Sequence, residues 1–246
     1  MMLEKASRIL LDAASHLAVL QTHAEPTLTA IRSEAVKTLD TMLHCLAVAN
    51  QTYFSTGFGR NLEELLALPV RPDDIEEQIS TIVESQQREA IIEGASSLLG
   101  SIRALLLSEL HSSQPGRSCS ELFTAYYPEI KGGLNKLYSA CRTGNRYLAV
   151  SAAVTVQYEV AQFLHASEGE SGGFSVLSGY ADYESAYDRH GLPDLVGLAS
   201  AGDLGKLRKA TDVFDRMIRE LIRTHGVALN EVTSPEEMTD QLWNAP

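Results

Sequence analysis

The segment 145–166 reads NRYLAVSAAVTVQYEVAQFLHA and carries only two formal charges, Arg146 and Glu159. Its apolar residues fall on every side of a helical wheel, which is typical of a membrane span or of the central helix of a larger folded domain. Gln157, Glu159 and Gln162 gather in its second half, and charge inside a bilayer is costly, so we expect no membrane span. The segment therefore predicts a central helix around which amphipathic neighbours pack.

Apolar residues three or four positions apart recur along the rest of the chain, which indicates further helices. Helical patterns of this kind cover the ranges 3–22, 26–50, 61–68, 74–111, 118–127, 129–141, 180–189, 194–202, 203–226 and 234–243. The apolar pattern of 74–111 weakens around Gln86 to Glu89, where we expect a bend or break. We find no alternating run long enough for a strand, and no internal repeat. The prediction is an all-α, multi-helix bundle of seven to ten helices around the apolar helix 145–166.

The chain of 246 residues is long enough for one large domain, and we predict a single all-α domain, 1–246. Pro115-Gly116 marks a possible sub-boundary in the loop 112–118. Gly132-Gly133 stands inside a predicted helix, where it would let another helix approach closely.

The composition is that of an acidic folded protein, with 44% hydrophobic residues and a formal net charge of −12. A surface this negative repels phosphate backbones and anionic lipid heads, so nucleic acid and membrane are disfavoured as partners. The three cysteines are widely spaced, which favours reduced thiols and a cytoplasmic location. Glu4 and Asp12 interrupt the apolar run that a signal peptide would need.

The common catalytic motifs are absent from the sequence. No Glu stands three residues before any of the seven histidines, and no HExxH or Cys/His cluster occurs, so we predict no metal site. GxSxG, a P-loop and a strand-associated GxGxxG are also missing. The sequence indicates no particular cofactor and leaves open whether the protein is an enzyme.

The densest polar cluster is GYADYESAYDRHGLPD, residues 179–194. On a helix its tyrosines share one face and could line a pocket for a planar ligand, while carboxylates near a histidine could act as an acid/base pair. The alternative interpretation is half-buried packing tyrosines and a solvated acidic face. The candidate ligand-binding residues are Tyr180, Tyr183 and Tyr187. The candidate catalytic residues are Glu184, Asp188 and His190.

The run LYSACRTGNRYLAVSAAVTVQYEVAQFL, residues 137–164, is followed later by an amphipathic helix. This arrangement resembles the helix–glycine–aromatic–helix texture of the HEPN family of helical RNases and nucleotidyltransferase partners. The nucleases of that family use an Arg and a His, four to six residues apart, as the catalytic pair. Arg219 and His225 have five residues between them, so the resemblance implies these two residues as a catalytic pair. A structural alternative is that His225 favours the negative end of a helix dipole.

Three functions remain open from the sequence. The leading one is a soluble acidic helical protein that acts by protein–protein interaction or by forming a homo-oligomer, because amphipathic helices occur without a catalytic motif. The alternative is a small-molecule or metal-dependent enzyme or binder that uses the segment 180–194. The second alternative is a HEPN-like helical RNase that uses Arg219 and His225.

Overall fold

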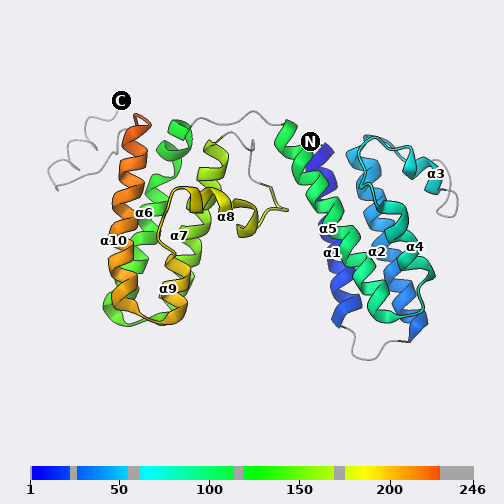
Figure 1. The fold of residues 1–246 in the computed structure, drawn as a ribbon, viewed down its shortest axis with the longest axis horizontal. Helices are drawn as coiled ribbons and strands as arrows, with labels where there is room; N and C mark the ends of the chain where they lie inside the picture. The colour runs from blue at the N-terminus through cyan, green and yellow to red at the C-terminus, as the bar shows by residue number, and fades with distance from the viewer. Residues whose placement is uncertain (1, 23–26, 55–60, 114–118, 169–174, 228–246) are drawn as a thin grey trace, which may run out of the picture. The chain divides into compact units, whose positions relative to one another are not determined.

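The structure, a computed structural model, describes residues 2–22, 27–54, 61–113, 119–168 and 175–227 (Figure 1). These residues form ten α-helices and no strand, which confirms the all-α multi-helix prediction. The predicted helix 234–243 lies outside the described residues. The helices are α1 (Met2–Thr22), α2 (Leu28–Ala49), α3 (Asn61–Leu66), α4 (Ile75–Glu84), α5 (Arg88–Ser113), α6 (Cys119–Thr143), α7 (Arg146–Ser167), α8 (Tyr180–Arg189), α9 (Leu195–Ala201) and α10 (Leu204–Thr224).

The chain divides into two compact units. Unit 1 comprises Met1–Gln114 with Ser171–Ser178, and unit 2 comprises Pro115–Glu170 with Gly179–Pro246. Each unit has a buried apolar core of its own. The first division falls in the loop 112–118, where the sequence suggests a sub-boundary. We predicted a single domain, 1–246. That the two units unfold together as one domain stays a prediction.

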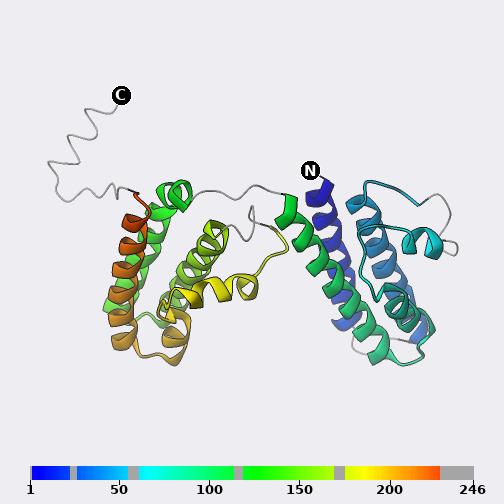
Figure 2. The ribbon, with the colours of Figure 1, turned by 45° about the horizontal axis from the view of Figure 1, so that its top comes forward.

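In unit 1 the long helices α1, α2 and α5 lie side by side, and α4 packs on α5 (Figures 1 and 2). Their facing sides bury apolar residues such as Leu10, Leu39 and Leu98. The segment 175–178 belongs to the same unit, because Leu177 is buried in this core and Arg103 Nε donates to its carbonyl at 2.8 Å. A segment that comes much later in the sequence therefore completes the core of unit 1.

The expected break in the predicted helix 74–111 separates α4 from α5. Ser85 has extended backbone (φ −62°, ψ 142°) and ends α4. Arg32 of α2 donates to the carbonyls of Val83 and Ser85, at 2.6 and 2.8 Å, and so satisfies groups that a helix end leaves unpaired. A side chain from another helix therefore holds the break in place.

Helix α5 is long and apolar enough over Arg88–Ser112 to cross a membrane, by length and composition alone. In the structure 39% of an 18-residue window within this stretch is buried, with Ile91, Leu98 and Ile102 in the core of unit 1. The core helix of a folded domain passes the same test. That the chain has no membrane partner stays a prediction.

In unit 2 the apolar helix α7 lies at the centre. Helices α6, α8 and α9 pack against it, and α10 packs on α6 and α9 (Figures 1 and 2). Half of its residues are buried, among them Ala153, Val156 and Val160. Its start is set by Asn145, whose side chain accepts a hydrogen bond from Leu148 N at 3.0 Å. The predicted central helix is therefore the core helix of unit 2.

Helix α6 is continuous from Cys119 to Thr143, whereas we predicted two helices that meet at Pro128. That prediction is wrong because the buried apolar side of α6 continues past Pro128. Phe123, Tyr127 and Ile130 are all buried. An interior proline costs about 3 kcal/mol. Burying three large side chains, at about 1.5–3 kcal/mol each, outweighs that cost.

The two units repeat one order of helices: two long, two short and one long. The lengths are 21, 22, 6, 10 and 26 residues in unit 1, and 25, 22, 10, 7 and 21 in unit 2. The packing repeats as well, because the first long helix contacts the second and the last in each unit. This similarity of helix order has no counterpart in a repeated sequence pattern.

Candidate functional site

A cavity of about 560 Å³ lies in unit 2 between α7, α8 and α9. Helix α7 supplies Val154, Gln157 and Tyr158, and α8 supplies Tyr180, Glu184, Tyr187 and Asp188. The lining is completed by Leu192, Asp194, Val196 and Gly197. Its size is that of a site for a small molecule. Four of the six candidate residues in the predicted cluster 180–190 therefore line one cavity.

Gln157 connects the three helices that enclose the cavity. Its side-chain amide donates to the Tyr180 hydroxyl at 2.7 Å, and its carbonyl oxygen accepts from Val196 N at 3.1 Å. The residue is buried, and a buried amide without partners would be costly. These two bonds therefore fix α8 and the first turn of α9 against α7.

The three predicted tyrosines divide between the cavity and the core. The Tyr187 hydroxyl donates to the Pro193 carbonyl at 2.6 Å, and its ring lies 6.4 Å from the rings of Tyr180 and Phe214. Tyr183 is 2% exposed and does not line the cavity. Its ring instead contacts those of Tyr158 and His165, both on α7.

The phenols that line the cavity are held in the neutral form. Burial raises the pKa of Tyr180, Tyr187 and Tyr158, and neighbouring carboxylates such as Asp188 raise the pKa of the first two further. Each phenol therefore keeps its proton at neutral pH and can donate a hydrogen bond.

The carboxylates Glu184, Asp188 and Asp194 also line the cavity. Asp194 caps α9, because its Oδ1 accepts from Gly197 N at 2.9 Å. A Cβ at Gly197 would collide with this carboxyl group as it is placed, so a larger residue there would displace the Asp194 side chain. Glu184 and Asp188 stand one turn apart on the exposed side of α8. The described lining residues include three carboxylates and no Lys, Arg or His.

His190 lies apart from this cavity. Its Nε2 is 3.0 Å from Oε1 of Glu168, which follows the last turn of α7, and Arg189 binds the other oxygen of the same carboxylate. The sequence predicts an acid/base partner for His190, and the structure places Glu168 beside it rather than Glu184 or Asp188. This arrangement ties the end of α8 to the end of α7.

Replacing Glu168 by glutamine is expected to lower the free energy of unfolding by about 0.5–1 kcal/mol at neutral pH, as for a partly exposed ion pair. Burial raises the pKa of Glu168, but hydrogen bonds and charges from Arg189 and His190 outweigh it, and the net pKa is lowered. Such a carboxyl stabilises the fold above its unfolded pKa, about 4.3, and the contribution disappears as the pH falls through the lowered value. Urea unfolding at about pH 7 and about pH 3 measures the difference. An equal loss of unfolding free energy at both pH values would contradict the assignment of Glu168 to this ion pair. The control is Glu220→Gln, on the exposed surface of α10.

Arg219 and His225 engage different partners on α10. Arg219 Nε donates to Asp215 Oδ1 at 3.1 Å, and Lys131 of α6 contacts the other oxygen of Asp215 at 3.3 Å. His225 follows the last turn of α10, with its Nδ1 2.8 Å from the Leu221 carbonyl. Residues six positions apart on a helix point about 120° away from each other. The RNase hypothesis stays a prediction, and alanine at both positions tests it.

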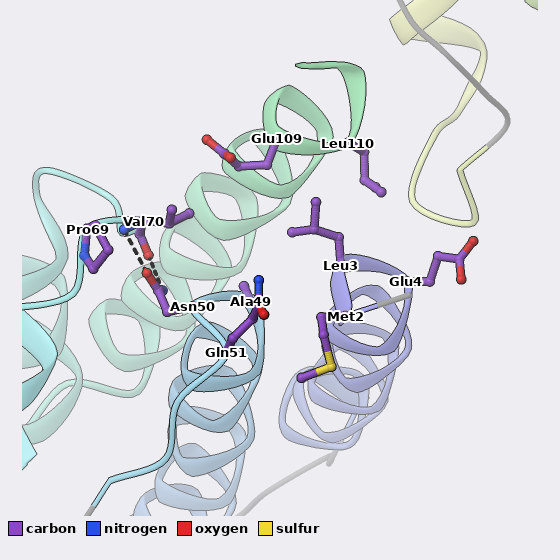
Figure 3. Close-up of a pocket in the computed structure, with 10 residues that line it drawn as sticks. All are labelled: Met2, Leu3, Glu4, Ala49, Asn50, Gln51, Pro69, Val70, Glu109 and Leu110. Atoms are coloured by element: carbon purple, nitrogen blue, oxygen red, sulfur yellow. Dashed lines mark hydrogen bonds between the residues drawn. The ribbon is translucent and has the colours of Figure 1, made fainter. Parts of the chain in front are cut away.

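A second cavity, of about 550 Å³, lies in unit 1 where the start of α1 meets the ends of α2 and α5 (Figure 3). Asn50 holds its edge, because its side chain donates to the Val70 carbonyl at 2.7 Å and accepts from Val70 N at 2.9 Å. Figure 3 shows Leu3 and Leu110 turned toward one another. None of the sequence-predicted site residues lines this cavity.

Metal ligands do not converge in the part of the chain that the structure describes: no group of three or more His, Cys, Asp or Glu side chains could hold an ion. The prediction of no metal site concerns the whole chain and stays a prediction.

Comparison with known proteins concerns unit 1. Residues 18–109 match the family described as the KNTase C-terminal domain. Unit 1 is similar to a nucleotidyltransferase-associated helical domain. The match runs from the last turns of α1 to near the end of α5, whereas the resemblance drawn from residues 137–164 lies in unit 2. No curated protein and no solved structure matches the chain significantly.

Proposed function

We propose that this chain is a helical component of a nucleotidyl-transfer system and that unit 2 binds a small molecule in the cavity between α7, α8 and α9. The observation that carries the proposal is the cavity itself, where apolar walls adjoin a few fixed polar groups. Binding sites for small molecules share this composition. Unit 1 contributes the similarity to a nucleotidyltransferase-associated domain.

The cavity is preorganised for binding. The Gln157 amide fixes the Tyr180 hydroxyl, and the hydrogen bond to Pro193 fixes the ring of Tyr187. A ligand that enters therefore meets side chains already held in place, so little conformational entropy is lost on binding.

A fragment titration followed by amide NMR tests this function. We expect fragments to shift the Val196 and Gly197 amides, which belong to the cavity wall, while the Glu220 amide on the exposed surface of α10 stays unchanged. Filling the cavity with Val154→Trp should abolish the shifts, whereas Val213→Trp, at a similarly exposed valine of α10, should preserve them. If no fragment of any charge shifts the cavity amides, the proposed function is wrong.

A second candidate function is docking of a nucleotidyltransferase chain on unit 1, favoured by the match of residues 18–109. Val19 of α1 and Val36 of α2 are exposed within the matched range. Co-expression with nucleotidyltransferases of the same genome should yield a complex that Val19→Asp and Val36→Asp weaken. Co-purification of none of them would contradict this candidate.

Homo-oligomer formation stays a separate proposal, because amphipathic helices often pack between subunits. Light scattering of the purified chain tests it directly. A mass of 26.8 kDa at all concentrations would contradict it.

A further inference from the structure

We propose that the ligand of the α7–α8–α9 cavity is an organic cation: a molecule with an ammonium group on an apolar body. The inference rests on the small-molecule function proposed above and assigns the ligand's chemical class. It draws on the charge of the cavity, on its aromatic walls and on the hydrogen-bond donor that remains available in it.

The charge of the cavity is uniformly negative. Glu184, Asp188 and Asp194 all line it, and no described lining residue is cationic. The basic residues at the end of α8, Arg189 and His190, contact Glu168 at the end of α7 instead. No ion pair to Glu184 or Asp188 is found among the described residues. Carboxylates gathered in this way repel one another and attract a cation.

The walls of the cavity favour an organic cation over a hydrated inorganic one. Tyr158 and Tyr180 line it and are partly exposed, and the faces of aromatic rings attract cations. Val154 and Val196 add apolar surface that a hydrated metal ion could not use. Divalent metals instead need several converging oxygen ligands, and no such group occurs in the described part of the chain.

The Tyr180 hydroxyl gives the cavity a hydrogen-bond donor. Its oxygen accepts from the Gln157 amide, so its own proton can be donated to another acceptor. A cation that also carries a hydroxyl or carbonyl oxygen could accept this proton. The predicted ligand therefore combines an ammonium group, an apolar body and at least one acceptor oxygen.

Choline and 3,3-dimethylbutan-1-ol form a matched pair of probes, because they share shape and hydroxyl group and differ in the charge. Titration of each into the full chain, followed by calorimetry and by the amide NMR signals of Val196 and Gly197, separates charge from shape. We expect choline to bind at least roughly tenfold more tightly than the neutral alcohol. Combined Glu184→Gln and Asp188→Asn substitutions should remove most of that preference. Glu220→Gln removes one negative charge from the exposed surface of α10 and should leave it intact.

Four results would count against the inference, and they differ in what else they overturn. Equal binding of the two probes would reject the cation while the small-molecule function stands. A preference for choline that survives in the double variant would reject Glu184 and Asp188 as the groups that attract it. If neither probe shifts the cavity amides while other fragments do, the ligand class is again wrong. If no compound of any charge shifts them, the proposed function fails together with the inference.

Discussion

Replacing Tyr187 by alanine is expected to lower the free energy of unfolding by about 3–5 kcal/mol, the usual cost of removing a buried aromatic ring. Tyr187 is 1% exposed, and its ring packs against Phe214 of α10 and Tyr180 of α8. Its hydroxyl also binds the Pro193 carbonyl in the turn before α9. The residue thus joins α8, this turn and α10, and the same substitution should abolish binding in the cavity.

Tyr187→Phe separates the packing of the ring from the hydrogen bond of the hydroxyl. It keeps the ring and leaves the Pro193 carbonyl without its donor, so we expect a loss of about 1–2 kcal/mol. Tyr147→Ala is the matched control, because Tyr147 is 85% exposed at the start of α7 and should change stability by less than about 0.5 kcal/mol. Chemical denaturation of the three variants measures all these values. Equal losses for Tyr187→Ala and Tyr147→Ala would show that Tyr187 is not in a packed core.

Replacing Gly133 by alanine is expected to destabilise unit 2 by about 1–2 kcal/mol. An added Cβ at this position of α6 would collide with a methyl group of Val156 on α7. Val156 is fully buried, and β-branched residues in helices have one preferred χ1 rotamer, so it cannot turn away cheaply. Overpacking of this kind costs about 1–3 kcal/mol, of which the better helix propensity of alanine recovers up to about 1 kcal/mol.

The neighbouring glycine supplies the control for this substitution. A Cβ at Gly132 would meet no atom within 4 Å, so Gly132→Ala should gain helix propensity without a collision. We expect it to raise the free energy of unfolding by up to about 1 kcal/mol. If the two substitutions have the same effect, α6 and α7 are not in the close contact that the structure shows.

Local sequence rules predict most helix boundaries because the signals are themselves local. Asp194 and Asp203 cap α9 and α10 through their own side chains, as their positions suggest, and Gly226 with a φ of 73° follows the end of α10. The close approach at Gly133 is confirmed too. Pro128 is different, because only the burial of α6 in a core decides whether the helix continues through it, and that burial depends on the tertiary structure.

Sequence patterns identify the residues of the candidate site only on α8. The spacing of Tyr180 and Tyr187 places both on the face that meets the cavity, but the same spacing also selects Tyr183, which packs into the core. Gln157 and Tyr158 lie on α7, more than twenty positions earlier, and no local pattern connects them with α8. A polar Gln in the middle of an apolar helix was the one available signal.

The repeated helix order of the two units has a consequence for function. Unit 1 carries the similarity to a nucleotidyltransferase-associated domain, and unit 2 has the same succession of long and short helices without that match. The cavity proposed to bind a ligand involves α8 and α9, the short helices of unit 2. In this proposal, the two short helices of unit 2, α8 and α9, form walls of the binding site.

Native-state hydrogen exchange of α7 is the decisive measurement, because the cavity exists only if this helix is the packed centre of unit 2. We expect the amides of Ala153, Val156 and Val160, all buried, to exchange only through global unfolding of the unit. Those of the exposed first turn, residues 146–147, should exchange orders of magnitude faster. Equal, fast exchange along the whole of α7 would contradict both the fold of unit 2 and the site built on it.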